Sequence, residues 1–85
     1  MRKEMVVQLA GGLEARPIAV LVQVASQYES SIYLEADGKR VNAKSIMGMM
    51  TMALKAGEKL LVEATGADEA AAIEGIEKYI SGQDA

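Results

Sequence analysis

The sequence predicts an α+β fold: a two-layer open-faced sandwich in which three helices cover one face of a four-stranded antiparallel sheet. Runs of β-branched and alternating apolar residues indicate four short strands. Three other stretches carry apolar residues at helical spacing, which indicates amphipathic helices. A chain of 85 residues leaves room for one core only, so we expect a single domain over residues 1–85. The expected order is strand, helix, strand, strand, helix, strand, helix.

The first strand and the first helix are separated by a glycine pair. Residues 4–9, "EMVVQL", are rich in β-branched side chains and indicate a strand, which Gly11 and Gly12 end. Pro17 suits the first turn of a helix, where its missing N–H costs nothing. We expect a helix over residues 16–27, with these apolar positions at helical spacing: Leu21, Val24, Ala25 and Tyr28.

A hairpin is expected in the stretch "SSIYLEADGKRVNAK". Its side chains alternate between two faces, Ile32, Leu34 and Ala36 on one and Tyr33 and Glu35 on the other. Asp37-Gly38 is a strong two-residue hairpin signal, so the second and third strands should pair around it.

The remaining elements are a short helix, a strand and a terminal helix. Ser45 is a good N-cap for a helix that starts at Ile46, and Gly48 weakens that helix, so we expect about two turns. Residues 59–65, "KLLVEAT", indicate the fourth strand. The stretch "ADEAAAIEGIEKYI" indicates a final helix whose expected buried stripe is Ala70, Ile73, Ile76 and Ile80.

Composition excludes several functions. The chain is 51% hydrophobic and 25% charged, as globular proteins are, and its net charge of −3 gives no reason to expect direct nucleic-acid or membrane binding. It has no cysteine and no histidine, which removes disulfides, thiolate metal sites and the commonest general base. No apolar run could span a bilayer or serve as a signal peptide. We therefore expect a cytoplasmic protein that is not an enzyme and has no catalytic residue, metal or cofactor.

The loop "GGLEARPIAV" raises a question about charge. A helix start beside Arg16 is a ready anion site, because unpaired backbone N–H groups point out of it. The first charged residue in that loop is nevertheless Glu14, which is itself an anion.

Three segments together resemble the HPr family, the small phosphocarriers of the bacterial phosphoenolpyruvate-dependent sugar transport system. They are "GLEARPIAV", "LEADGKRVNAKSIMGMM" and "ATGADEAAAIE", and the resemblance covers roughly residues 3 to 80. In that family the loop reads Gly-x-His-Ala-Arg-Pro, and aligning it on "ARP" places the phosphorylated histidine at Glu14. Because the chain contains no histidine, the resemblance implies a member without phosphocarrier activity in sugar transport.

The resemblance also implies a second phosphorylation site at Ser45. In Gram-positive bacteria HPr kinase/phosphorylase phosphorylates the serine of the "KSIMG" motif, and the phosphoserine form acts as corepressor for catabolite control protein A in carbon catabolite repression. The pairing of Glu14 with Ser45 looks most like the Crh branch of the family, although that branch carries glutamine at the histidine position. A phosphate would add a charge of about −1.5 to −2 at a helix N-terminus. That end favours anions, so we expect a surface signal rather than a conformational switch.

An exposed apolar surface is expected next to this serine. A helix of barely two turns cannot bury all of its apolar side chains, and exposed ones usually mark an interaction site. By resemblance, Ile46, Met47 and Met50 face outward while Met49 and Met52 face inward. The resemblance extends the partner-binding set to residues of the preceding helix: Arg16, Ala19 and Val20.

Several alternatives stay open. Arg16 either pairs with Glu14 or anchors a partner, and Glu14 either imitates a phosphorylated histidine or is simply a tolerated polar residue. A different function would be phosphotransfer through an acyl phosphate on Glu14, and another would be a subunit of a larger assembly that uses only the fold. A homodimer formed by exchange of the first strand is also possible, because Gly11 and Gly12 could act as its hinge.

Overall fold

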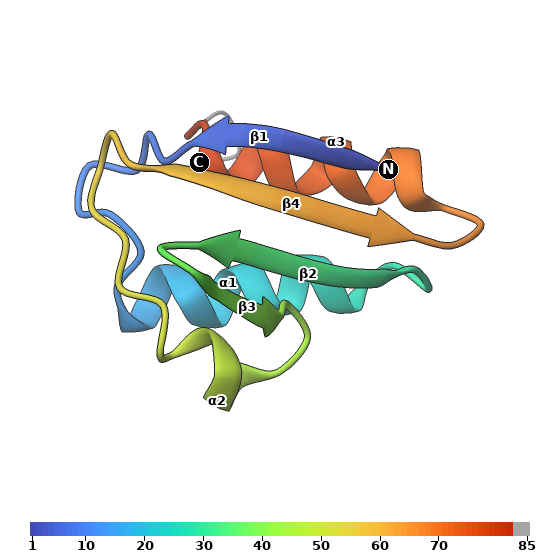
Figure 1. Ribbon diagram of the computed structural model, residues 1–85, viewed down its shortest axis with the longest axis horizontal. Helices are drawn as coiled ribbons and strands as arrows, with labels where there is room; N and C mark the ends of the chain where they lie inside the picture. The colour runs from blue at the N-terminus through green and yellow to red at the C-terminus, as the bar shows by residue number, and fades with distance from the viewer. Residues whose placement is uncertain (83–85) are drawn as a thin grey trace.

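The structure is a computed structural model that describes residues 1–82. Its elements run in the order β1 (Arg2–Val6), α1 (Ala15–Ser26), β2 (Ser31–Ala36), β3 (Lys39–Asn42), α2 (Ile46–Met49), β4 (Lys59–Thr65) and α3 (Glu69–Ile80). Figure 1 shows α1 and α3 behind a single sheet whose other face is open. The predicted open-faced α+β sandwich is confirmed.

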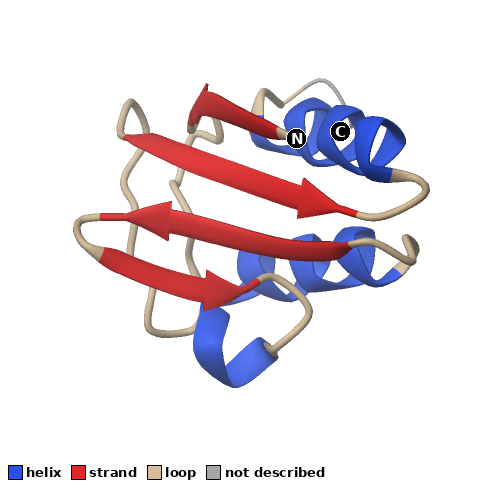
Figure 2. Ribbon diagram, turned by 45° about the vertical axis from the view of Figure 1, so that its right-hand side comes forward, coloured by secondary structure: helices blue, strands red, loops and turns tan. Residues whose placement is uncertain are grey.

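The sheet has the strand order β1-β4-β2-β3, and every neighbouring pair is antiparallel. Strands β1 and β3 therefore form its edges, as Figure 2 shows. The β2–β3 hairpin turns at Asp37 and Gly38, which both have positive φ, 52° and 76°. Positive φ at both turn residues is the conformation that two-residue hairpins favour, so this prediction is confirmed.

The core lies between the sheet and the two long helices. Alternate residues of β2 and β4 point toward the helices, and α1 and α3 contribute their apolar stripes. The largest fully buried side chains include Leu21, Ile32, Leu34, Met49, Leu60, Ile76 and Ile80. Helix α2 lies beside the β3 edge and packs against α1 and β3 (Figure 1).

Strand β1 begins and ends earlier than residues 4–9. Its register with β4 runs from Arg2 opposite Glu63 to Val6 opposite Lys59. Val7 still donates to Glu58 O at 2.9 Å, and the chain turns away at Gln8, whose N–H donates to Ile80 O at 2.9 Å. The C-terminal end of β1 therefore depends on a tertiary partner that local sequence does not show.

Two details of the helices also differ from the expectation. Ala70 is exposed, and Ala72 takes its place in the buried stripe of α3. Helix α2 has four residues rather than about two turns. It ends early because Thr51 N–H donates to Gly48 O at 3.2 Å and Thr51 Oγ1 donates to the same oxygen at 2.7 Å, a tightened last turn.

Asp68 ties the start of α3 to the loop between α1 and β2. Its carboxylate accepts from the Ser30 hydroxyl, from the Ser30 N–H at 3.0 Å and from the Glu29 N–H at 2.9 Å. These hydrogen bonds, led by that of the Ser30 hydroxyl, hold the pKa of Asp68 below its ordinary value. These hydrogen bonds fix the start of α3 next to the loop that follows α1.

Candidate functional site

Ser45 is the N-cap of α2, as predicted. Its backbone is extended, and its Oγ accepts from the Gly48 N–H at 3.3 Å. The side chain is half-buried, and among residues 1–82 its hydroxyl donates to no protein acceptor. An oxygen that accepts one long hydrogen bond and donates none keeps its proton and a lone pair available for phosphorylation.

Hydrogen bonds hold the segment that leads from β3 to Ser45 in place. Asn42 Oδ1 accepts from the Lys44 N–H at 2.8 Å, and the Ser45 N–H donates to Asn42 O at 3.0 Å. The Lys44 ammonium reaches back to Tyr28 O at 2.6 Å. Lys44 therefore joins the end of α1 to the start of α2, which sets the position of Ser45 relative to the long helix.

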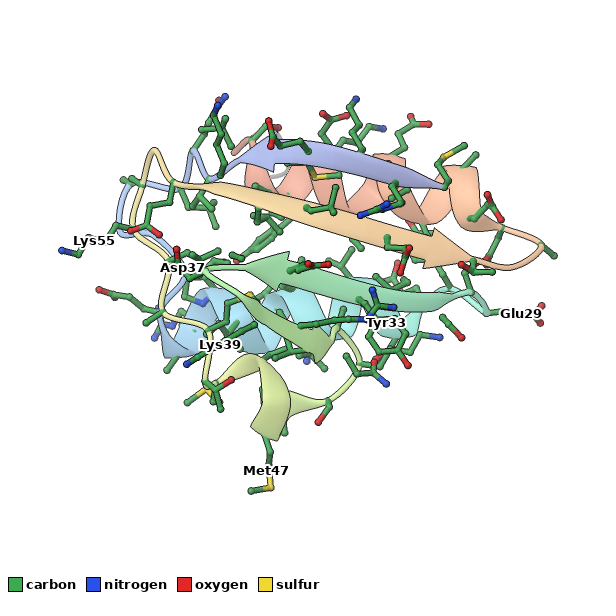
Figure 3. The ribbon with its side chains drawn as sticks, viewed as in Figure 1. Glu29, Tyr33, Asp37, Lys39, Met47 and Lys55 are labelled. Carbon is green, nitrogen blue, oxygen red and sulfur yellow. The ribbon has the colours of Figure 1, made fainter. Side chains whose placement is uncertain are left out.

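Three apolar side chains of the α2 turn face outward: Ile46 is 44% exposed, Met47 81% and Met50 52%. These three residues are called the α2 patch. Met49 and Met52 are 0% and 3% exposed, so the predicted inward and outward split is confirmed. Figure 3 shows Met47 pointing away from the body of the molecule at the tip of α2.

Helix α1 begins at Ala15, directly after Glu14. The Glu14 side chain forms no capping hydrogen bond, and both Glu14 and Arg16 are exposed. Within the described chain no ion pair joins them. The interpretation in which Arg16 simply pairs with Glu14 is therefore wrong, and over residues 1–82 neither side chain has an ion-pair partner.

The loop that carries Glu14 is held in place by a close backbone contact. Gly12 has φ +71°, and a Cβ atom there would lie 2.5 Å from Leu54 O. Next to it the Leu13 N–H donates to the same oxygen at 2.7 Å. Only glycine fits a backbone that has positive φ and lies this close to a carbonyl.

The predicted partner-binding residues come from two helices that touch. Helix α2 carries the α2 patch, and α1, which packs against it, carries an exposed Arg16, an exposed Ala19 and a half-buried Val20. The structure brings the two helices together at the edge of the sheet. The roles of these residues in binding stay predictions.

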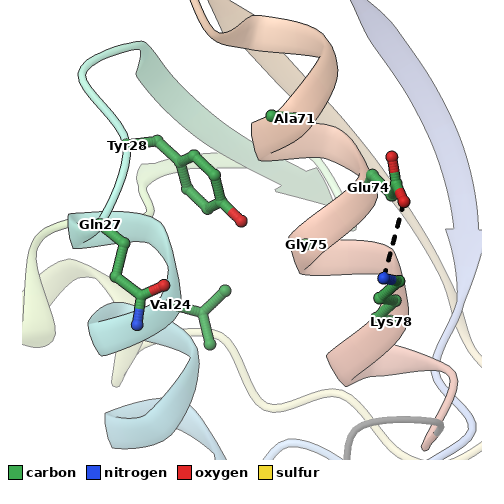
Figure 4. Close-up of a pocket in the computed structure, with 7 residues that line it drawn as sticks. All are labelled: Val24, Gln27, Tyr28, Ala71, Glu74, Gly75 and Lys78. Atoms are coloured by element: carbon green, nitrogen blue, oxygen red, sulfur yellow. Dashed lines mark ion pairs between the residues drawn. The ribbon is translucent and has the colours of Figure 1, made fainter.

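A groove between α1 and α3 has no counterpart in the sequence-based prediction. Its volume is about 410 Å³, and it is lined by Val24, Gln27, Tyr28, Ala71, Glu74, Gly75 and Lys78. Figure 4 shows the Tyr28 hydroxyl directed toward Gly75, with the Glu74–Lys78 pair at 3.6 Å on the opposite helix. A Cβ atom on Gly75 would lie 2.1 Å from Tyr28 Oη. A glycine in the middle of a helix was the available signal, since glycine there usually has a packing reason.

The residues described offer few other kinds of chemistry. Over 1–82, no group of three or more carboxylate, histidine or cysteine side chains could hold a metal ion. In the same part of the chain, no helix is both long enough and apolar enough to cross a membrane.

Comparison with known proteins gives a consistent result. A family described as "PTS HPr component phosphorylation site" matches residues 1–82. The HPr-like protein Crh of Bacillus subtilis (strain 168) is 44% identical over 80 residues, which cover 94% of each chain. The crystal structure of HPr-C-His from Thermoanaerobacter tengcongensis superimposes with a TM-score of 0.91 at 38% identity, covering 98% of this chain and 93% of that one.

A crystal structure of Bacillus subtilis Crh, described as a dimer with a swapped domain, is also similar. Its TM-score is 0.77 at 46% identity, and the match covers 89% of this chain and 87% of that chain.

Proposed function

Because the chain belongs to the HPr family and is similar to Crh, we propose that it is a cytoplasmic regulatory adaptor of carbon catabolite repression. HPr kinase/phosphorylase phosphorylates Ser45, and the phosphorylated chain then acts as corepressor for catabolite control protein A. The protein carries a signal and does not catalyse a reaction. It does not relay phosphate to sugars.

The observation that carries this proposal is the position of Ser45. Its hydroxyl lies at the N-cap of α2, and the three side chains of the α2 patch follow within five residues. A phosphate on Ser45 would place a charge of about −1.5 to −2 and strong hydrogen-bond acceptors directly beside an apolar surface. A partner that offers a basic group and an apolar pocket would then bind the phosphorylated form in preference, and Arg16 on the adjacent helix would add a charged anchor.

The missing imidazole separates this function from that of a phosphocarrier. The chain has no histidine, and Glu14 occupies the position that carries it in the family. A carboxylate can be phosphorylated only when its surroundings activate it, whereas Glu14 is exposed and has no ion-pair or capping partner in the described chain. The alternative of an acyl phosphate on Glu14 therefore has less support.

The test begins with the kinase. Wild-type protein incubated with HPr kinase/phosphorylase and ATP should gain one phosphate on Ser45, read by mass spectrometry, and only this form should bind catabolite control protein A tightly. Ser45→Asn is the matched variant, because asparagine caps a helix as well as serine does but cannot be phosphorylated. Ser31→Ala is the control, since it removes an exposed hydroxyl on the sheet and should leave phosphorylation intact.

Two results would contradict the proposal. An unmodified Ser45 after kinase treatment would favour a subunit that uses only the fold. A phosphate on Glu14 after incubation with phosphoenolpyruvate and enzyme I would favour the phosphocarrier alternative.

Two interpretations of Glu14 can be separated by one substitution. If its negative charge imitates a phosphorylated histidine, Glu14→Gln should weaken binding of the Ser45-phosphorylated chain to the regulator. Unchanged affinity would show that any polar residue suffices there. Isothermal titration of both phosphorylated proteins measures the difference.

A homodimer formed by exchange of β1 is a further part of the proposal. Among the strands of residues 1–82, β1 is an edge strand whose one neighbour is β4, so a second copy could supply the same pairing without a new interface. The Crh structure with a swapped domain supports this arrangement. Sedimentation equilibrium over a range of concentrations would detect the dimer, and a single monomeric species throughout would contradict it.

A further inference from the structure

The six methionines of this chain divide sharply by exposure. Met49 is 0% exposed, Met52 3% and Met5 4%, whereas Met47 is 81% exposed and Met50 is 52% exposed. Exposed and buried thioethers thus alternate within six residues, 47 to 52. Only the exposed members belong to the α2 patch, and the chemistry of sulfur gives them a property that leucine at the same positions would lack.

A thioether reacts with a hydroperoxide in a balanced two-electron step. The sulfur lone pair attacks the outer oxygen of hydrogen peroxide, the O–O bond breaks, an S–O bond forms and water leaves. Sulfur is oxidised to the sulfoxide and the peroxide is reduced. The product side chain is polar and chiral, and methionine sulfoxide reductases restore the thioether.

We propose that Met47 and Met50 form a reversible oxidation site that controls docking at the α2 patch. This inference rests on the proposed function, because it takes the α2 patch as the surface that meets the regulator. Hydroperoxide converts the two exposed thioethers to sulfoxides, the surface loses its apolar character, and the Ser45-phosphorylated chain releases its partner. The carbon-source signal on Ser45 is then read only while the neighbouring sulfurs are reduced.

The geometry restricts the change to the surface. Met47 is 81% exposed and Met50 52%, so we expect oxygen added to either side chain to meet water and to leave the core unaltered. Met49 lies behind them in the core, where a sulfoxide would disrupt packing. The fold should therefore survive oxidation of the exposed pair.

Oxidation of Met47 and Met50 should weaken binding of the phosphorylated chain to the regulator. A sulfoxide oxygen buried in an interface without a donor loses its hydrogen bonds to water, and this cost opposes association. We expect the affinity of the phosphorylated chain for the regulator to fall at least about tenfold, equivalent to about 1.4 kcal/mol.

The first half of the test establishes the site. The folded chain is treated with graded hydrogen peroxide and digested, and the oxidised methionines are identified by mass spectrometry. We expect Met47 and Met50 to be oxidised well before Met5, Met49 and Met52, at doses that leave the far-UV circular dichroism and the Tm unchanged. Equal rates for Met47 and Met49 would overturn the proposal.

The second half connects the site to docking. Ser45-phosphorylated wild type is titrated against catabolite control protein A before peroxide, after peroxide and after repair by methionine sulfoxide reductase. The matched variant is Met47→Leu/Met50→Leu, which keeps the apolar surface but has no sulfur to oxidise there. Wild type should lose affinity on peroxide treatment and regain it on repair, while the affinity of the variant, compared with its own untreated value, should not change with peroxide, even though peroxide still oxidises its exposed Met1.

The outcomes separate the two proposals. Unchanged affinity of the doubly oxidised wild type, or an equal loss in the leucine variant, would overturn the oxidation switch. Failure of unoxidised, phosphorylated wild type to bind the regulator would overturn the proposed function and with it the docking role of the sulfurs.

Discussion

The open face of the sheet and the α2 patch are both exposed, yet the side chains of the sheet face contact one another through charged groups, whereas those of the α2 patch are apolar. On the sheet, Arg40 donates to Glu63 at 2.7 Å and stacks over the Tyr33 ring at 4.3 Å, and Arg2 lies 3.6 Å from the same carboxylate. Figure 3 shows Tyr33 on this surface and Met47 at the tip of α2, away from it. The sheet residues satisfy one another across all four strands, whereas the α2 patch presents apolar groups that only a partner could cover.

The difference shows that exposure alone does not mark a site. The charged side chains of the sheet face bind one another. They therefore discourage other protein molecules from associating with the edges or the face of the sheet, and they do not attract a ligand. An apolar side chain that is exposed to water lowers the free energy when a binding partner covers it, so it favours association. The α2 patch is therefore the surface on which substitutions should change binding, and the sheet face is the surface on which they should change stability slightly.

The largest effect is expected from a residue that lies just beneath the α2 patch. Met49→Ala removes a fully buried side chain and should lower the free energy of unfolding by about 2–5 kcal/mol. Met50→Ala removes an exposed one and should change the free energy by less than about 0.5 kcal/mol. Urea denaturation followed by circular dichroism compares the two. Similar losses would mean that the α2 patch is part of the core.

The next effect concerns binding. Met47→Ala should weaken binding of the Ser45-phosphorylated chain to catabolite control protein A by about tenfold, because truncation removes an apolar anchor. Arg40→Gln on the sheet face should leave that affinity unchanged. Titration calorimetry of both phosphorylated variants measures the contrast, and an equal loss in both would erase the distinction between the two surfaces.

A smaller effect is expected from titration of the sheet network. The hydrogen bond from Arg40, aided by the nearby charges of Arg40 and Arg2, holds the pKa of Glu63 below its ordinary value. A lowered pKa means that the carboxylate contributes stability above its unfolded pKa and loses that contribution as the pH falls through the folded one. Glu63→Gln should therefore have a lower Tm than wild type at neutral pH.

The two Tm values should converge in acid. Thermal melts from neutral pH down through the carboxylate range would show this convergence. A constant difference at all pH values would indicate that the network contributes through packing rather than charge.

The smallest effect is expected from Arg40→Lys. Lysine keeps the positive charge but loses the planar fork that reaches Glu63 and the flat surface that stacks on Tyr33. We expect a Tm only slightly below that of wild type and a weaker dependence of Tm on salt than the wild type shows. Melts at low and high sodium chloride measure both quantities. A Tm loss as large as that of Met49→Ala would overturn the view that this face is energetically minor.

Local sequence was sufficient where neighbouring residues decide the structure. Asp37-Gly38 predicted the hairpin because only such a pair accepts two positive φ values, and Ser45 predicted the start of α2 because its oxygen reaches the Gly48 N–H. The strand Lys59–Thr65 was also predicted with the bounds observed.

Tertiary partners decided the rest. The end of β1 depends on Ile80, which accepts from Gln8, and the burial of Ala72 in place of Ala70 depends on how α3 rotates on the sheet. The groove beside Gly75 depends on a tyrosine 47 positions earlier. For the site, the resemblance supplied Ser45 and the direction of each methionine, but the absence of an Arg16–Glu14 ion pair in the described chain required the structure.

Gly12 has a consequence for genetic screens. Its Cα lies against the carbonyl of Leu54, so every other amino acid there would push the segment that carries Glu14 away from the body of the protein. A saturation library selected for binding to a partner should therefore lose most alleles at codon 12, although Gly12 is buried and has no side chain that a partner could contact. Counting such codons as contact sites would misplace the binding surface, and only a parallel selection for protein abundance would tell the two causes apart.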